Sequence, residues 1–420
     1  MEDRKILYFI ESIQSNKHED GPNKYSIVME DVEESRERSY FRMIERESIP
    51  KPSDSAYPVY EGQYVYYSPQ TDNFSLAYNN EMARIRQRDN LKYRRHLISY
   101  QLAHQIDDGK EDSAKLNDVE NVTSYHINVG HGNCTIMVLR DCKTYQLWMV
   151  DCGGMDMLNR RCYFTNIQTC IDQIARILNV QSAELKISRF FLTHWHYDHI
   201  SGINFLIDSG YITNNTVFYM NLYYPHSSQC ANDLLKRLDD MHVMCYEPIS
   251  SLRKVPALTI LYPERRIRKW HSVKDPNCSL VMDMNNTSVV YSFDICGRIM
   301  VFPGDLEKAG WDTMTFSRSC QRKPLCRTDY YCISHHGSIN GHVDIPCLGN
   351  SCYSRVAECL HRRLLKAVLM GRNGAYSGIY SPIVINYFGN TLRYSEKDGV
   401  SQSCKAYVLD WCGNSEKYVY

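Results

Sequence analysis

The chain has 420 residues and a formal net charge of zero, because 48 Lys and Arg residues balance 48 Asp and Glu residues. That length suits roughly two to three domains and can bury a sizeable core without disulfides. A neutral balance argues against a polycationic or an acidic tail protein, although it permits a local basic patch. With 43% hydrophobic and 23% charged residues, the composition is that of an ordinary globular protein.

The cysteines and the lack of targeting patterns indicate the cellular compartment of the protein. No stretch approaches the roughly 18 consecutive apolar residues of a membrane-spanning helix, so we expect no membrane association. Residues 1–5 lead into only a short apolar patch, so we expect no secretory signal. The 17 cysteines include no CxxC pair, which favours reduced, buried thiols over a zinc ribbon or a disulfide framework. We therefore expect a cytoplasmic protein.

Residues 1–115 differ in texture from the rest, and we expect them to form a small N-terminal α+β accessory domain for recognition or partner binding. Residues 29–48 are dense in charge and predict a solvated helix or a mobile connection. The tyrosine-rich residues 57–78 predict short antiparallel strands. Asn80 is a candidate cap for a helix that runs to about residue 106. The apolar positions of this helix are Ile85, Leu91, Leu97, Ile98 and Leu102.

The same helix carries six basic side chains, at Arg84, Arg86, Arg88, Lys92, Arg94 and Arg95. They could follow a nucleic-acid backbone, with Tyr93 and Tyr100 available for stacking. The alternative is a solvated helix face with no ligand. Residues 107–117 are polar and predict a linker.

Residues 116–420 show the alternation of strands and helices that predicts one layered α/β domain. Apolar runs at 135–139, 146–150 and 187–192 predict strands. Between the last two of these runs lies a helical stretch. Its apolar face is expected at Ile167, Ile171, Ile174, Ile177 and Leu178.

The strongest chemical signal is residues 193–199, where three histidines and an aspartate follow an apolar strand directly. A loop that leaves a strand can direct His194 and His196 toward one cation, and Asp198 and His199 toward a second. Neutral imidazole and carboxylate suit zinc, and they also suit manganese or iron. The alternative is a surface histidine cluster without an ion.

Two further strand ends supply donors of the same kind. Residues 299–306 contain an apolar strand followed by Asp305, a carboxylate that could bridge two cations. Residues 331–338 contain a second strand, followed by His335 and His336. If the three strand ends converge, their Asp and His side chains predict a dinuclear metallohydrolase.

Taken in order, these segments resemble the metallo-β-lactamase superfamily, and within it the hydrolase domain of ComEC-type competence proteins. The likeness spans about residues 123–415 and includes a glycine-rich opening at 128–134 and an aspartate motif at 149–154. It implies a metallo-β-lactamase-like αββα sandwich in which Asp151 orients the metal loop by hydrogen bonds. The metal ligands that it implies are His194, His196, Asp198, His199, Asp305 and His335.

The resemblance also implies catalytic roles for Asp198, His336 and Tyr380. Asp198 would bind metal and accept the proton of the nucleophile, and His336 would face the substrate or support His335. Tyr380 stands where the family has a histidine, and its phenol is a hydrogen-bond donor for a phosphate or an oxyanion.

Besides Tyr380, the sequence departs from the family pattern in two further places. Asn128, His131 and Asn133 stand where the competence group has Asp, Gln and Asp, which removes negative charge near the site. The third histidine that many relatives use for the first metal has no clear equivalent. His226 is a candidate, and the alternative is that it is an exposed loop histidine.

We therefore expect a hydrolase that uses two divalent cations, Zn²⁺ or Mn²⁺, to activate water and cleave the phosphodiester bonds of nucleic acid as a soluble nuclease or phosphodiesterase. One alternative is a hydrolase of a small-molecule ester, lactone or cyclic nucleotide. Another is a degenerate, non-catalytic binding module. Nucleic acid is the expected substrate, and a protein partner would bind through residues 1–115.

Overall fold

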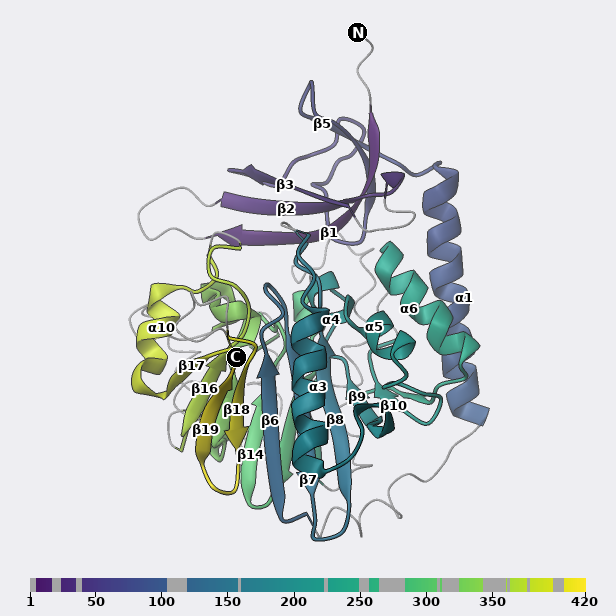
Figure 1. Cartoon of the computed structure of the whole chain (residues 1–420). Helices are drawn as coiled ribbons and strands as arrows, with labels where there is room; N and C mark the ends of the chain where they lie inside the picture. Colours follow the sequence, from purple (N-terminus) through teal and green to yellow (C-terminus); the bar gives the residue numbers. More distant parts are fainter. Residues whose placement is uncertain are drawn as a thin grey trace.

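The computed structural model describes most of the chain. The described residues are 5–16, 24–34, 40–103, 119–157, 160–222, 226–248, 257–263, 284–307, 310–311, 325–342, 360, 363–375, 378–395 and 404–420. Their strands form three sheets, of which one belongs to the N-terminal residues and two form the core that follows (Figure 1). The predicted linker at 107–117 lies outside the described residues, and so does the predicted domain boundary between residues 115 and 116.

The N-terminal sheet is antiparallel and has the strand order β3-β2-β1-β4-β5. Its strands are β1 (Ile6–Asn16), β2 (Lys24–Asp31), β3 (Phe41–Arg46), β4 (Tyr64–Ser68) and β5 (Asn73–Leu76). The antiparallel strands predicted within residues 57–78 are confirmed as β4 and β5. The helix or mobile connection predicted over residues 29–48 is wrong for the described part of that range, where β2 and β3 pair; residues 35–39 lie outside the described residues. On β3, Phe41 and Met43 pack against one hydrophobic cluster and Ile44 belongs to another, as expected for side chains that alternate between the two faces of a strand.

The helix predicted from Asn80 is confirmed as α1 (Glu81–Ala103), and the Asn80 side chain accepts a hydrogen bond from the backbone N–H of Ala83 at 3.1 Å. Its buried face was predicted correctly only in part, at Leu97, which is buried, and at Ile98, which packs against the core. Ile85 and Leu91 are 38% and 41% exposed, and Leu102 is 62% exposed. The buried residues of α1 repeat at intervals of three and four, and they are Ala83, Arg86, Asn90, Arg94 and Leu97.

The buried face of α1 is polar because it bonds to the core domain. The helix lies beside α6 (Gln229–Asp240) (Figure 1). Arg94 donates to the carbonyl oxygen of Leu222 at 3.0 Å, and Asn90 donates to that of His226 at 2.6 Å. Two of the six basic residues expected on a nucleic-acid-binding face, Arg86 and Arg94, are therefore internal contacts.

The core is a sandwich of two sheets. The eight-stranded sheet has the order β11-β10-β9-β8-β7-β6-β18-β19, and the six-stranded sheet has the order β12-β13-β14-β15-β16-β17. The first contains β6 (Asn121–Ile127), β7 (Cys134–Arg140), β8 (Tyr145–Cys152), β9 (Ile187–Phe191), β10 (Val217–Tyr219), β11 (Cys245–Tyr246), β18 (Ala406–Asp410) and β19 (Ser415–Val419). The second contains β12 (Leu258–Tyr262), β13 (Val290–Ile295), β14 (Arg298–Phe302), β15 (Tyr330–Cys332), β16 (Lys366–Leu369) and β17 (Leu392–Tyr394).

Aromatic side chains fill the space between the two sheets. The ring centroid of Phe293 on β13 lies 5.0 Å from that of Phe191 on β9 and 5.9 Å from that of Trp148 on β8. The strands predicted at 135–139, 146–150 and 187–192 are confirmed as β7, β8 and β9. Their apolar runs reflect burial on both faces.

Helices cover the outer faces of the sandwich. On the eight-stranded sheet lie α3 (Phe164–Leu178), α5 (Ile203–Asp208) and α6, and on the six-stranded sheet lies α10 (Pro382–Phe388). The predicted helix–sheet–sheet–helix layering is thus confirmed. On α3, Ile167, Ile171 and Ile174 face the core as predicted, whereas Ile177 is 46% exposed. Short helical turns are α4 (Tyr197–Ile200), η2 (Ser182–Glu184), η4 (Asn285–Thr287), η5 (Ser334–Gly337), η6 (Ile339–Gly341) and η8 (Gly389–Thr391). Among the described helices, none has the length and apolar character needed to cross a bilayer.

The N-terminal sheet packs on one end of the sandwich (Figure 1). Glu61 is 5% exposed and connects the two parts through its carboxylate. One oxygen accepts from the backbone N–H of Ile13 at 2.7 Å, and the other accepts from that of Met284 at 2.6 Å. Nearby, the Tyr64 hydroxyl donates to the carbonyl oxygen of Ser227 at 2.7 Å. The interface is therefore held by buried, directional bonds as well as by apolar contact.

Replacing Glu61 by Ala leaves two backbone N–H groups without their acceptor, so we expect the free energy of unfolding to fall by about 3 kcal/mol. Urea denaturation followed by circular dichroism measures this loss. The matched control is Glu33→Ala, an exposed glutamate of the same domain, which should change stability by less than about 0.5 kcal/mol. Equal losses for the two variants would contradict the role assigned to Glu61.

Candidate metal centre

The predicted metal loop, residues 193–199, leaves the carboxyl end of β9 and enters α4. In the eight-stranded sheet β9 runs parallel to both β8 and β10, so the loop emerges at the edge where β8 also ends. Its side chains His194, His196, Asp198 and His199 are at most 4% exposed. A surface histidine cluster is therefore excluded.

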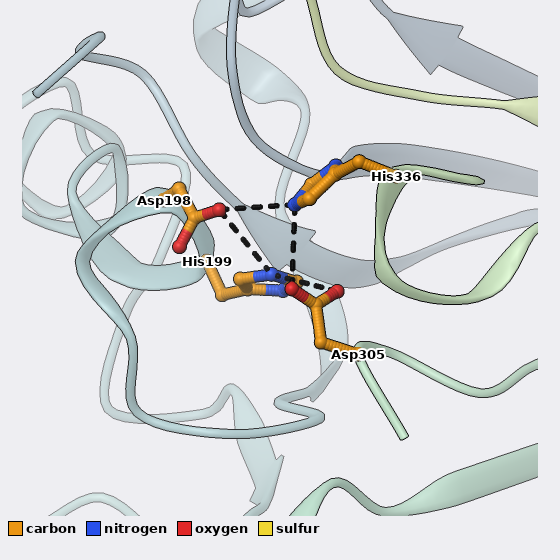
Figure 2. Close-up of side chains that lie close together, drawn as sticks. All are labelled: Asp198, His199, Asp305 and His336. Atoms are coloured by element: carbon orange, nitrogen blue, oxygen red, sulfur yellow. Dashed lines mark hydrogen bonds and ion pairs between the residues drawn. The ribbon is translucent and has the colours of Figure 1, made fainter. Parts of the chain in front are cut away.

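Four side chains from three strand ends meet at this edge (Figure 2). They are Asp198, His199, Asp305 and His336, which we call the Asp/His cluster, and each places a ligand atom within 4.8 Å of the others. Nε2 of His336 lies 3.0 Å from Oδ2 of Asp198 and 3.3 Å from Oδ2 of Asp305. Nε2 of His199 lies 3.3 Å from Oδ1 of Asp305. These distances are close to the separation of about 3.4 Å between two ligands of a tetrahedral ion with bonds of about 2.1 Å.

Hydrogen bonds to Nδ1 fix the ring orientation of the two histidines of the cluster, His199 and His336. Asp151 accepts from Nδ1 of His199 at 2.8 Å, and it also accepts from the backbone N–H and the hydroxyl of Thr193, both at 2.7 Å. Nδ1 of His336 lies 3.1 Å from the carbonyl oxygen of Met370. A proton held on Nδ1 leaves the Nε2 lone pair free, so both rings present Nε2 to the cluster. Asp151 thus bonds to the first residue of the metal loop and to His199, and its role in support of a metal site stays a prediction.

The remaining two loop histidines form a second set of donors beside the cluster. Nε2 of His194 lies 3.1 Å from Nδ1 of His196. The ring of His226 lies next to them, with its centroid 6.1 Å from that of His196. His226 is 1% exposed, so the alternative of an exposed loop histidine is wrong. We call His194, His196 and His226 the histidine group.

The structure separates the two adjacent histidines at the end of β15. His335 and His336 have φ angles of +47° and +49°, in the left-handed region that is uncommon for residues other than glycine. This backbone turns the ring of His336 into the cluster, whereas Nδ1 of His335 lies 3.2 Å from Oε1 of Glu307. The ligand implied by the resemblance is His335, but the residue brought to Asp198 and Asp305 is His336.

Tyr380 supports the backbone near His336. Its hydroxyl donates to the carbonyl oxygen of Gly371 at 2.6 Å, and its backbone N–H donates to the carbonyl oxygen of His336 at 3.0 Å. A Cβ atom added at Gly371 would lie 2.7 Å from Nδ1 of His336, so a glycine is needed for the ring to fit. The phenol bonds to the protein here, and its predicted role as a donor to the substrate stays a prediction.

His131 is a residue of the site that the sequence analysis treated only as a departure. It is 2% exposed, its Nε2 lies 3.5 Å from Oδ2 of Asp198, and its ring centroid lies 4.3 Å from that of His336. The signal that marks it is its pair of flanking glycines. A Cβ atom at Gly132 would lie 2.4 Å from the carbonyl oxygen of Asp198. Close approach of this loop to the metal loop therefore requires glycine.

Burial and charge give the two sets of histidines different protonation behaviour. Burial lowers the pKa of His194 well below its usual value and lowers that of His196 to about 4, so both rings are neutral. Burial also opposes charge on His336, but the carboxylates of Asp305 and Asp198 outweigh it and raise its pKa to about 10. For Asp198, burial would raise the pKa, but the neighbouring imidazoles hold it below its usual value. The two carboxylates therefore favour positive charge at this point, either on the imidazole of His336 or on a divalent cation that takes the place of its proton.

The donor set fits a divalent cation. Its members offer nitrogen and oxygen atoms, which suit zinc and also manganese or iron. In the part of the chain that the structure describes, Oδ1 of Asp305 and Nε2 of His199 and His196 are buried and make no hydrogen bond. The buried Asp/His cluster is therefore consistent with a metal site.

Comparison with known proteins finds similarity only at the level of structure. No family model matches this sequence, and no curated protein is similar to it. The metallo-β-lactamase fold protein YhfI from Bacillus subtilis is 13% identical over 69% of this chain and 100% of its own, with a TM-score of 0.36. A diphosphatase of the PhnP family is 9% identical over 66% of this chain and 96% of its own, with a TM-score of 0.33. Unliganded yeast PDE1 is 13% identical over 65% of this chain and 97% of its own, with a TM-score of 0.34. Similarities this low assign no activity to this chain.

Because Asp151 holds the proton on Nδ1 of His199, Asp151→Asn should weaken the binding of zinc to the chelator-treated protein by about 10- to 100-fold. Isothermal titration calorimetry measures the affinity. Asp294→Asn, which changes an exposed aspartate on β13, is the control and should bind zinc as the wild type does. Wild-type affinity in Asp151→Asn would show that the orientation of His199 does not depend on this bond.

Proposed function

We propose that this protein is a metal-dependent phosphodiesterase, with nucleic acid as the first candidate substrate. The observation that carries the proposal is the convergence of three strand ends on the buried Asp/His cluster beside His194 and His196. The order and spacing of these motifs resemble those of ComEC-type hydrolases, which supports a phosphodiester rather than a lactam. The intact set of donors argues against the alternative of a degenerate binding module.

The residues of this chain would divide the work among them. When bound, divalent cations lower the pKa of a coordinated water and offset the negative charge of a phosphate. The low pKa of Asp198 keeps it ionised, so it can bind a cation and hold the nucleophile in place. His131 lies beside Asp198 and His336 and is suited to hydrogen-bond a phosphate oxygen. Asp151 would hold the geometry of the loop constant during the reaction.

The surroundings of the site favour a slender substrate over a duplex. Phe41 of the N-terminal sheet packs on Tyr197 of the metal loop with ring centroids 4.8 Å apart, and Phe9 packs on His226 at 5.0 Å. The sheet therefore covers one side of the centre. A single strand, or a small phosphodiester such as a cyclic nucleotide, needs less open space than a double helix. The small phosphodiester is accordingly the second candidate.

The test is hydrolysis by the full-length protein with Mn²⁺ or Zn²⁺ added. Single-stranded and duplex DNA, RNA, a cyclic nucleotide and bis(p-nitrophenyl) phosphate serve as substrates. We expect cleavage that EDTA abolishes. We also expect His196→Ala and Asp198→Asn to lower the rate on the order of 10³-fold, because each removes a donor for a cation.

Asp208→Asn is the control, because this exposed residue lies in an ion pair with Arg237. It should leave the rate unchanged. Full activity in the presence of EDTA, or in both site variants, would refute the proposal. Cleavage of the cyclic nucleotide without cleavage of any nucleic acid would select the second candidate.

A further inference from the structure

We propose that the N-terminal sheet completes the metal centre, and that Glu11 on β1 is the carboxylate of a cation site formed with the histidine group. The inference rests on the proposed function, because it assigns a further residue to the same centre. It also gives residues 1–115 a part in the chemistry, beyond the recognition or partner binding expected from the sequence.

Glu11 lies at a β-bulge, a position where strands often redirect a side chain toward a functional site. The pairing of β1 with β2 passes from Ile10 opposite Met29 directly to Ser12 opposite Val28, so Glu11 has no partner on β2. The extra residue points its side chain toward the core domain, where it is 0% exposed. An ordinary strand would bury an apolar side chain at such an interface.

The carboxylate of Glu11 contacts both the metal loop and His226. One oxygen accepts from the backbone N–H of Tyr197, which lies between His196 and Asp198 in the metal loop, at 2.9 Å. The other oxygen, Oε2, lies 3.3 Å from Nε2 of His226. Glu11 therefore joins the metal loop to His226.

The unsatisfied atoms around Glu11 indicate that a partner is required. Oε2 of Glu11 and Nε2 of both His196 and His226 are buried and make no hydrogen bond within the described part of the chain. A buried carboxylate oxygen in this state is strongly unfavourable unless a cation compensates it. Oε2 of Glu11 and Nε2 of His226 lie 3.3 Å apart, and the other Glu11 oxygen is bonded to the loop that carries His196, so these atoms are available as donors to a metal ion.

Two other buried glutamates of the same interface show the contrast. Glu61 accepts from two backbone N–H groups, and Glu30 accepts from the backbone N–H of Gln229 and lies 3.4 Å from the guanidinium of Arg86. Those carboxylates are satisfied by groups that cannot bind metal. Glu11 faces histidines instead, so its surroundings are those of a ligand or of a charge-balancing group in a metal site.

The histidine group and Glu11 lie as two neighbouring pairs, His194 with His196 and His226 with Glu11. Together they offer three imidazoles and one carboxylate, a set of donors that zinc accepts. The ring of His226 is held by Phe9, which packs edge-on at 84° with centroids 5.0 Å apart. The same strand thus supplies the carboxylate and orients the histidine beside it.

The experiment measures metal binding without reference to turnover. Full-length wild type, Glu11→Gln and Glu30→Gln are stripped with a chelator and then titrated with Zn²⁺ in competition with a chromophoric chelator. Glu30→Gln is the matched control, because it changes a buried glutamate of the same interface. We expect the wild type and Glu30→Gln to bind two ions. We expect Glu11→Gln to bind one ion normally and the second at least about 10-fold more weakly.

Visible absorption of the Co²⁺-substituted proteins gives a second readout, because it reports the ligands of the ion. It should change in Glu11→Gln and not in Glu30→Gln. Two ions bound with wild-type affinity and an unchanged Co²⁺ spectrum in Glu11→Gln would overturn the inference and leave the proposed function standing. A wild type that binds neither Zn²⁺ nor Mn²⁺ would overturn the proposed function itself, and the inference with it.

If Glu11→Gln does not fold, Glu11→Asp replaces it, since the shorter side chain keeps the charge and withdraws the oxygen from His226. A weakened second ion and a shifted Co²⁺ spectrum in Glu11→Asp would support the inference. Wild-type values for both would overturn it.

Discussion

The centre depends on one buried carboxylate, Asp151 at the end of β8. It ties the start of the metal loop to the sheet through two bonds to Thr193, and it orients His199 through a third. Asp151 itself has a φ angle of +52°, so its backbone is bent to bring both oxygens to the neighbouring strand end. Without these hydrogen bonds, packing alone would position the loop. Packing restricts the rotation of an imidazole ring less than a hydrogen bond to a carboxylate does.

The parts of the structure that the sequence predicted are those that neighbouring residues encode. The strands β7, β8 and β9 follow from continuous apolar runs, and the start of α1 follows from the capping side chain of Asn80. The metal loop could be predicted from the sequence because its donor residues are nearly consecutive and follow a buried strand. In each case the physical cause, whether burial, capping or the turn after a strand, acts within about ten residues of chain.

The parts that were missed depend on partners that are remote in sequence or on backbone geometry. Arg94 and Asn90 are buried on α1 because carbonyl groups more than a hundred residues away accept their hydrogen bonds. His336, rather than His335, points into the Asp/His cluster because both residues have left-handed backbone conformations. The residue types alone do not predict these conformations. Glu11 bonds to Tyr197, 186 residues along the chain, and no local pattern distinguishes it from the other glutamates of the N-terminal third.

The separation of the contributing segments along the chain has a consequence for biosynthesis. The strand that carries Glu11 is synthesised before its partners Tyr197 and His226, and the histidine that closes the Asp/His cluster follows only at residue 336. Since domains generally fold in the order of their synthesis, the N-terminal sheet would hold the Glu11 carboxylate exposed to water until the segment that contains Tyr197 and His226 has been made. Docking of the nascent sheet would thus follow synthesis of the metal loop, and a cation that arrived before it would lack the proposed Glu11 donor.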